Sequence, residues 1–567
     1  MTSEERFKIT SNDYVDLFIQ YYGNEANLEP YRENSVHIMN VRYAVQYVPA
    51  AQISSATIAE IGYEAIPSCY GLESIRSLEV SGVIRIREAP AFGLRGSGVL
   101  VGIVDTGIDY TNPIFRRNDG TSRVAALWDQ TIDSENGYPE GTFYGTEYDA
   151  DQINRALASE NPYDIVPSKD ELGHGTILAG IAAGSESEEN NFSGVVPDSD
   201  LLVVKLKQAK PVIRELLAIP LDVPAYQEND IIWGIQYLIT TARRLGMPIA
   251  ICIGMGTSRG SHDGRGVLGL VITVLAALPG IAIVISAGNE GSMRRHYFGT
   301  IDPAIGYNTV ELNVGDNESD FAMELWGAAP STYSIDITSP GGEYIPRITE
   351  GLRVSREINF IFEQTNINVD YFMIESRVGD ELILMRFHKP TAGVWTFQVY
   401  GRGDLPGSFH IWLPMNDFIS ENTYFVQPNP YTTITLPGNA LVPITVTAYN
   451  PENSTLYQNA SKGFTRINDI KPDLAAPGVN ITAPTLEQGF DNVTGTGAAA
   501  AHATGISAML LEWGIVRGND ARVNTVDIKN YLIRGAKRNP RLQYPNRDWG
   551  YGIIDIYNVF NILRSGF

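Results

Sequence analysis

Between about residues 97 and 311, short apolar runs alternate with stretches of helical spacing. Four apolar runs have the length of buried strands: Val99–Val104, Leu201–Lys205, Ile249–Ile253 and Ile281–Ser286. Helical stretches such as Asp230–Leu245 and Val267–Leu278 lie between them. This alternation predicts an α/β fold with a doubly wound parallel sheet. Ligands of such sheets gather at the carboxyl ends of the strands, so Asp105 and Asn289, which follow two of these strands, are candidate functional residues.

Residues 1–72 have a different pattern, which predicts a small α+β module. Its expected elements are a helix at Asn12–Tyr22, strands at Val36–Met39 and Tyr43–Val48, and a second helix at Thr57–Gly62. The segment Ile66–Gly71, with its proline, serine and glycine, is expected to be a linker. Such a module can be either a binding domain or a prodomain.

Between residues 312 and 428 the alternation of strands and helices stops. Short strands recur there instead, separated by turns that contain glycine and proline. This pattern predicts an all-β sandwich inserted into the α/β domain. The α/β pattern resumes near Val442–Ala448. The predicted domains are 1–72, 73–311, 312–428 and 429–567, of which the second and fourth form one α/β domain.

Composition narrows the possible functions. The net charge of −23 argues against nucleic acid as a partner, because phosphate binding requires a basic surface. Two cysteines among 567 residues do not form a disulfide scaffold. The N-terminus has neither a basic region nor an apolar signal core, and no run has the length of a membrane span. We therefore expect a protein that is made and kept inside a cell, or inside a compartment derived from one. No acidic cluster has the spacing of a calcium loop, so we expect no metal, and no cofactor is expected either.

Four motifs along the chain carry possible chemistry. Asp105 ends an apolar strand in a glycine-supported turn, and His174 stands at the start of a helix of small residues. Asn289 places a side-chain amide just past a buried strand, as an oxyanion hole requires. The turn Thr494–Gly497 leads into an uncharged apolar helix, whose unpaired N–H groups and positive dipole end suit an oxyanion or a nucleophile. Each motif alone also has a structural explanation, since an aspartate can cap a turn and a lone histidine is usually structural.

Taken in order along the chain, these motifs resemble those of the subtilisin-like serine proteases, the S8 subtilases. The resemblance covers about residues 97–567 apart from the inserted sandwich. It implies that Asp105 is the triad aspartate, His174 the general base and Asn289 the oxyanion donor. It also implies a substrate-binding strand at Gly254, Met255 and Gly256, although the family usually has serine where Gly254 stands. Further matches are Gly194–Pro197, Val203–Lys205, Lys471–Gly478 and Trp549–Gly552.

The resemblance fails at the nucleophile. The family pattern is Gly-Thr-Ser-x-Ala, and the run from Gly495 to Ala499 aligns with it without a gap and places Gly497 at the serine. Downstream, His502 also fits the family helix, where it is expected to pack or to form a hydrogen bond within the helix. Glycine has no side chain and cannot form an acyl-enzyme. Thr494 and Thr496 are nearby hydroxyls that match, or lie beside, structural positions of the motif.

The N-terminal module, the absent secretion signal and the inserted sandwich together resemble the germination-specific Csp subtilases of spore-forming clostridia. That resemblance implies that residues 1–72 are a prodomain that stays bound and that the insertion is a jelly roll. It also implies a location in the spore cortex or coat region. The implied partners are other Csp-type subtilases, a cortex-lytic proenzyme, the chain's own prodomain and a small-molecule germinant.

Three hypotheses follow. In the first, the chain is a pseudoprotease that senses or relays the germinant signal by binding, and residues 1–72 remain covalently joined. In the second, it is a germination-specific endopeptidase that processes a cortex-lytic proenzyme, and its serine has been replaced or another nucleophile acts. In the third, it is a scaffold protein without a signalling role.

Overall fold

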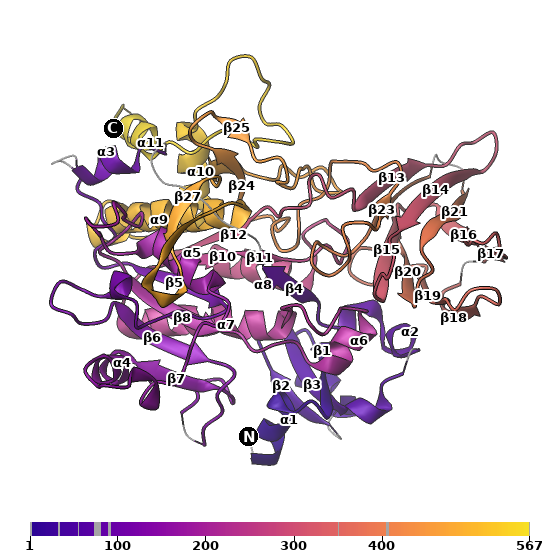
Figure 1. Cartoon of the computed structure of the whole chain (residues 1–567), viewed down its shortest axis with the longest axis horizontal. Helices are drawn as coiled ribbons and strands as arrows, with labels where there is room; N and C mark the ends of the chain where they lie inside the picture. The colour runs from indigo at the N-terminus through magenta and orange to yellow at the C-terminus, as the bar shows by residue number, and fades with distance from the viewer. Residues whose placement is uncertain are drawn as a thin grey trace.

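The computed structural model describes the chain except for residues 1–2, 32–33, 55, 73–80, 89–91, 136, 350, 404–406 and 566–567. Figure 1 shows three parts, namely an N-terminal module, a central α/β core and a β-rich part that projects to one side of the core. The N-terminal module lies against the core, beside the base of the β-rich part (Figure 1).

The core is built on a nine-stranded sheet with the order β25-β24-β12-β10-β5-β8-β6-β7, in which β26 also pairs with β24. Neighbouring strands from β24 to β6 are parallel, whereas β7 and β25 pair antiparallel at the two edges. The predicted doubly wound parallel sheet is therefore confirmed. The strands are β5 (Leu100–Asp105), β6 (Val124–Asp129), β7 (Thr146–Asp149), β8 (Asp200–Lys205), β10 (Ile249–Ile253), β12 (Ile281–Ser286), β24 (Ile444–Asn450), β25 (Thr455–Leu456) and β26 (Leu474–Pro477).

Helices cover both faces of this sheet. On one face α7 (Glu228–Leu245) and α8 (Val267–Ala276) pack on alternate strand residues, and on the other α5 (His174–Ala183) and α9 (Thr496–Leu511) pack on the remaining ones. The other core helices are α3 (Val83–Glu88), α4 (Ala150–Leu157), α6 (Pro211–Leu216), α10 (Thr525–Gly535) and α11 (Ile556–Ser565). Short 3-10 turns lie at Pro113–Phe115, Pro162–Asp164 and Leu486–Gln488, the last between the hairpin strands β27 (Ile481–Pro484) and β28 (Phe490–Val493).

Helix α9 is the central helix of the core, and every one of its residues is buried. Its small residues permit close packing, since a Cβ added at Gly505 would lie 2.4 Å from the Cβ of Val195. Together with the π-helical turn Glu512–Val516 it forms an apolar stretch, Thr496–Val516, that is long enough to cross a membrane by length and composition. No run of membrane-spanning length is expected from the sequence, so this stretch is a difference between expectation and structure. Since 83% of its most apolar 18 residues are buried inside the protein, the stretch is packed as a core helix.

The N-terminal module is a three-stranded antiparallel sheet, β1-β3-β2, with two short helices. Its elements are α1 (Ser3–Thr10), β1 (Tyr14–Gln20), β2 (Ser35–Ile38), β3 (Tyr43–Pro49) and α2 (Thr57–Ile61), with 3-10 turns at Glu25–Tyr31, Ala50–Gln52 and Tyr63–Ala65. The predicted helix at Asn12–Tyr22 is wrong, because this segment forms β1. Both faces of β1 are buried, so its apolar residues form a nearly continuous run in which strand and helix spacing cannot be told apart.

The predicted linker at Ile66–Gly71 is also corrected by the structure. Its end forms strand β4 (Cys69–Leu72), which pairs antiparallel with β11 (Met255–Gly256) on one side and with β9 (Tyr226–Gln227) on the other. The signal for a linker is local, whereas this strand forms only because two distant segments of the core flank it. The N-terminal module is thus joined to the core by a small antiparallel sheet (Figure 1).

The inserted part is a β-sandwich, as expected for the fold class. Its first sheet has the order β13-β22-β15-β20-β19-β18 and its second the order β17-β16-β21-β14-β23, with an apolar core between them. Its strands begin at His296, before the predicted boundary at residue 312, because β13 is recruited by pairing with the distant β22. The strands are β13 (His296–Thr300), β14 (Tyr307–Val314), β15 (Phe321–Gly327), β16 (Thr332–Thr338), β17 (Tyr344–Ile348), β18 (Arg353–Asn359), β19 (Asn366–Phe372), β20 (Glu381–His388), β21 (Gly393–Arg402), β22 (Ser408–Trp412) and β23 (Tyr424–Phe425).

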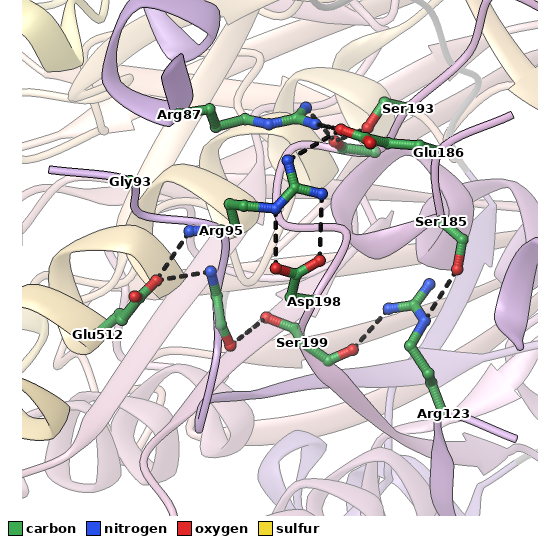
Figure 2. A network of polar contacts seen from close by, with 12 residues as sticks. Arg87, Gly93, Arg95, Arg123, Ser185, Glu186, Ser193, Asp198, Ser199 and Glu512 are labelled. Carbon is green, nitrogen blue, oxygen red and sulfur yellow. Dashed lines mark hydrogen bonds and ion pairs between the residues drawn. The ribbon is translucent and has the colours of Figure 1, made fainter. Parts of the chain in front are cut away.

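A polar network fastens the start of the core to the far ends of α5 and α9 (Figure 2). The buried carboxylate of Glu512, just after α9, accepts the backbone N–H groups of Arg95 and of the next residue at 2.9 and 2.7 Å. The guanidinium of Arg95 pairs with Asp198 at 2.8 Å and with Glu186 at 2.9 Å, and Glu186 also pairs with Arg87 of α3. The network therefore holds the segment that enters β5 against both helices.

Candidate functional site

An aspartate and a histidine meet at the carboxyl end of β5. Asp105 is the last residue of that strand and fully buried, and His174 is the first residue of α5. Nδ1 of His174 lies 2.7 Å from Oδ1 of Asp105, which also accepts the N–H of Thr106 at 2.8 Å. The Thr106 hydroxyl accepts the N–H of Gly175 at 2.9 Å, so strand end and helix start are tied together. An imidazole that donates from Nδ1 to a carboxylate presents Nε2 as the basic nitrogen.

Asp170 holds the start of α5 and was not identified from the sequence. Its carboxylate accepts the N–H groups of Gly173 and Thr176 at 2.8 and 2.9 Å and the hydroxyl of Thr176 at 2.7 Å. It thus satisfies donors that a helix N-terminus leaves unpaired, and it orients the histidine. Asp170 stands three residues before Gly173, which occupies the N-cap position without a side-chain cap, so the usual capping signal does not point to it.

The predicted oxyanion donor lies beside the start of α9. Asn289 follows β12, and its Oδ1 accepts both the backbone N–H and the hydroxyl of Thr496 at 3.2 Å. The same hydroxyl accepts the N–H of Gly288 at 3.1 Å. These bonds fix the orientation of the Asn289 side-chain amide, so that its NH₂ group points away from Thr496. They also engage the Thr496 hydroxyl, while Thr494 accepts the N–H of Asn480 at 3.4 Å. Both hydroxyls therefore hold backbone in place, which argues against either as a replacement nucleophile.

Gly497 is the second residue of α9, in the turn whose N–H groups have no partner within the helix. The helix has 16 residues, and its positive dipole end favours a negatively charged or polar group at this position. The structure thus brings Asp105, His174, Asn289 and Gly497 to one edge of the sheet. The arrangement can polarise a carbonyl and accept a proton, but position 497 offers no atom that could attack.

Strand β4 lies against the segment that is predicted to bind substrate. Strand β4 lies between β11 and β9, with Leu72 opposite Met255 and Gly71 opposite Gly256. Met255 and Gly256 are the residues predicted to bind substrate as an extended strand. The N-terminal module therefore supplies an extended segment at the position that is predicted for a substrate.

Tyr70 anchors this segment. Its side chain is 1% exposed, and its hydroxyl lies 3.5 Å from Oε1 of Glu228 at the start of α7. Glu228 also accepts the N–H groups of Ser68 and Leu268 at 3.1 and 2.9 Å. Glu228 was missed by the sequence analysis, because a single acidic residue at a helix start gives no sign of three distant donors.

Removing the Tyr70 anchor should loosen β4. In the Tyr70→Ala variant we expect the opening free energy of β4 to fall by about 3–5 kcal/mol, the usual cost of truncating a buried aromatic residue. Hydrogen exchange of the β4 amides measures this directly. The matched control is Tyr22→Ala, since Tyr22 is 67% exposed and should leave β4 unchanged. Equal exchange in the two variants would show that Tyr70 does not hold the segment.

Gly254, which precedes β11, differs from the family serine for a reason visible in the packing. A Cβ added there would lie 2.6 Å from Cδ1 of Leu178 and 3.4 Å from Cε1 of His174. Leu178 of α5 thus occupies the space that a serine side chain at residue 254 would need. A serine at 254 therefore requires the far end of the Leu178 side chain to shift.

His502 packs in the core, as one of the two expected alternatives has it, and it makes its hydrogen bond outside its own helix. Its Nε2 lies 2.5 Å from the hydroxyl of Ser81, which is equally buried and belongs to the segment before α3. The ring is fully buried, and burial lowers its pKa from 6.5 to about 3. The interaction joins α9 to the start of the core and takes no part in the arrangement around His174.

The buried imidazole predicts a specific loss of stability in acid. Its folded-state pKa of about 3 lies below the unfolded value of 6.5, so the unfolded chain binds the extra proton between these values. The contribution of His502 to stability is complete above pH 6.5 and falls by up to about 1.4 kcal/mol per unit below it. The His502→Gln variant should therefore show a flatter dependence of unfolding free energy on pH between 6 and 4. Parallel curves for the variant and the unmodified chain would contradict this assignment.

Within the described ranges, no group of three or more His, Cys, Asp or Glu side chains is arranged to hold a metal ion. Both cysteines are buried and unpaired.

Comparison with known proteins identifies the architecture. The model of the subtilase family, peptidase S8, matches residues 96–314 and 420–552. The solved structure of the CspB protease of Clostridium perfringens superposes with a TM-score of 0.75 at 31% identity, covering 86% of this chain and 97% of that one.

Curated sequences give more distant matches. The subtilisin-like protease SBT1.9 of Arabidopsis thaliana is 25% identical over 472 residues, which are 73% of this chain and 57% of the plant protein. The C5a peptidase of Streptococcus pyogenes is 23% identical over 455 residues, 73% of this chain and 34% of that protein. The chain thus spans about a third to somewhat over half of the length of these relatives.

Proposed function

This chain is a member of the subtilase family, and from that premise we propose that it acts by recognition and not by peptide-bond hydrolysis. The observation that carries the proposal is Gly497 at the second residue of α9, the position that aligns with the family's nucleophile. Without a side chain there, no acyl-enzyme forms. The Asp105–His174 pair remains, at 2.7 Å, but it has no serine hydroxyl to deprotonate.

The position of β4 supports the same proposal. Strand β4 takes the place of an extended substrate between β11 and β9, and Tyr70 and Glu228 hold it there. A chain that cannot cut this segment keeps it covalently attached to the N-terminal module. Partner proteins must then bind to surfaces other than the position that β4 occupies between β11 and β9.

The biological setting is proposed from the likeness to the CspB protease of Clostridium perfringens. We assign the chain to the Csp-type subtilases of clostridial spores, where it regulates germination. It binds an active Csp-type protease or the cortex-lytic proenzyme and relays the germinant signal to the processing step. A small germinant is a further ligand of this system.

A second candidate function rests on the intact Asp105–His174 pair and on Asn289. In this alternative the chain derives from an active endopeptidase, and only its nucleophile has been substituted. The retention of a well-formed pair at 2.7 Å favours this alternative, because a long-inactive site commonly loses more than one member.

Reconstituted processing tests the proposed function. An active Csp-type protease and a cortex-lytic proenzyme are mixed with and without an equimolar amount of this chain, and the processed product is followed by gel electrophoresis. We expect the rate of processing to change several-fold, while this chain alone leaves the proenzyme intact. Cutting by this chain alone would overturn the proposal, and an unchanged rate without complex formation in size-exclusion chromatography would overturn the relay role.

A further inference from the structure

A hollow of about 730 Å³ lies behind the strand end that carries Asp105. One wall is formed by Thr106, which follows Asp105, and by Lys205 at the end of β8. The opposite wall is the segment between β8 and β9, which contains α6 with Arg214 and leads to Tyr226. The volume falls in the range of ordinary ligand sites. The hollow is distinct from the position between β11 and β9 that β4 occupies.

Arg214 is an unusual cation for this position. Its side chain is 4% exposed, and its Nη2 donates to the carbonyl oxygens of Pro220 and Val223, the latter at 2.7 Å. In the part of the chain that the structure describes, no carboxylate forms an ion pair with it, and its buried Nε has no acceptor. Asp222 acts on it only at longer range, and burial lowers the pKa of Arg214.

Neighbouring buried cations are compensated differently. Lys205, in the same hollow, pairs with Glu171 at 2.7 Å, and Lys207 pairs with Asp230 at 2.6 Å. Lys210, four residues before Arg214, pairs with Asp16 at 2.5 Å. A buried charge without a counter-ion is costly, and a carboxylate from outside would remove that cost through a charge-assisted hydrogen bond. Glu171 and Asp222 also line the hollow, so among its described lining cations Arg214 is the one that lacks a directly paired carboxylate, and an acidic group that reaches it would supply that partner.

The rim of the hollow indicates how that anion is presented. Leu172 and Leu221 line it and are 49% and 68% exposed, so two large apolar side chains face solvent at its mouth. A small anion inside the hollow would leave both leucines uncovered. A polypeptide segment that crosses the mouth would cover them while it inserts one side chain.

We propose that this hollow binds an acidic side chain on a segment of a partner protein, with Arg214 as counter-ion and Leu172 and Leu221 as apolar contacts. The proposal rests on the proposed recognition function only in requiring that a partner exists. It adds a location, a charge and a peptide chemistry for that recognition. It requires no catalytic step and leaves β4 in place.

A positional-scanning library of acetylated pentapeptides, with each of the twenty residues in turn at the central position, tests this inference on the full-length chain. We expect peptides with central Asp or Glu to be retained at least tenfold better than those with central Asn or Gln. Absence of an acidic preference in the unmodified chain would overturn the proposal, whatever the outcome of the processing assay. The two failures are thus distinguishable.

Three variants locate the binding. Arg214→Gln should abolish the acidic preference and Arg214→Lys should retain part of it, because the charge remains. Leu221→Ser changes an exposed residue, so it should keep the fold and lower retention several-fold. An acidic preference that persists in a folded Arg214→Gln protein would overturn the assignment of the counter-ion. Displacement of the bound peptides by hexanoate at equal concentration would identify a small carboxylate as the ligand and would overturn the polypeptide.

Discussion

Replacing Gly497 by serine is expected to create a nucleophile that reacts with a fluorophosphonate and releases the N-terminal module. The elements that such a serine needs are in place, since His174 is oriented by Asp105 at 2.7 Å and Asn289 is fixed by Thr496. In subtilisin the nucleophile accounts for about 10⁶ in kcat, so a gain from no reaction to a readily measured one is expected. Labelling and the appearance of a separate N-terminal fragment on a gel measure the two effects.

Two control variants test whether the labelling depends on the introduced hydroxyl and on His174. Gly497→Ala adds a Cβ without a hydroxyl and should remain unlabelled, and His174→Ala in the Gly497→Ser background should remove most of the gain. A folded Gly497→Ser protein without labelling would show that the surroundings have also diverged. In that case the triple variant with Gly254→Ser and Leu178→Val tests the packing between these two positions, because serine at 254 would otherwise contact Leu178 at 2.6 Å.

The second large effect is expected at a buried ion pair between the N-terminal module and the core. Asp16 of β1 is fully buried, and its Oδ1 lies 2.5 Å from Nζ of Lys210, which is 2% exposed. Its Oδ2 accepts from Asn229 at 2.9 Å and from Gln227 at 3.3 Å. Asp16→Ala leaves the buried Lys210 without its counter-ion and with only the Lys8 carbonyl as a hydrogen-bond acceptor at 3.0 Å, so the opening free energy of β1 should fall by about 3–5 kcal/mol.

Hydrogen exchange of the β1 and β3 amides measures this loss. The double variant Asp16→Ala and Lys210→Met should recover most of the stability, because it removes both charges and fills the space with an apolar side chain. A loss below about 1 kcal/mol in Asp16→Ala would contradict the importance of the pair. A double variant that is no more stable than Asp16→Ala would also contradict the importance of the pair. The ion pair between Asp16 and Lys210 therefore stabilises the attachment of the N-terminal module to the core.

The parts that the sequence predicts correctly depend on local pattern. The strands before Asp105 and Asn289 are apolar runs of five or six residues, and their flanking helices have regular spacing. Once the parallel sheet is inferred, the carboxyl ends of its strands place Asp105 and Asn289 at one edge, whereas His174 stands at the start of helix α5. Gly497 is found only through the resemblance to the family pattern, and its place at the start of an apolar helix agrees with that alignment. These residues are therefore accessible to sequence reasoning because each stands at the end of a regular element.

The structural features that the sequence does not predict depend on pairing between distant segments of the chain. Cys69–Leu72 becomes a strand only between β11 and β9, and β13 joins the sandwich only through β22. Asp16 and Lys210 are separated by most of the N-terminal module and much of the core, yet they form one buried pair. Tyr14–Gln20 is buried on both faces, so its pattern does not distinguish strand from helix. Tertiary contacts decide each of these cases.

The central claim is that Gly497 leaves the unmodified chain without peptidase activity, so that its N-terminal module stays attached. Intact mass spectrometry of the purified chain after incubation with a fluorophosphonate tests it most directly. We expect one species with the mass of the whole 567-residue chain and no adduct. A separate N-terminal fragment, or an adduct of the fluorophosphonate on the remaining chain, would contradict it.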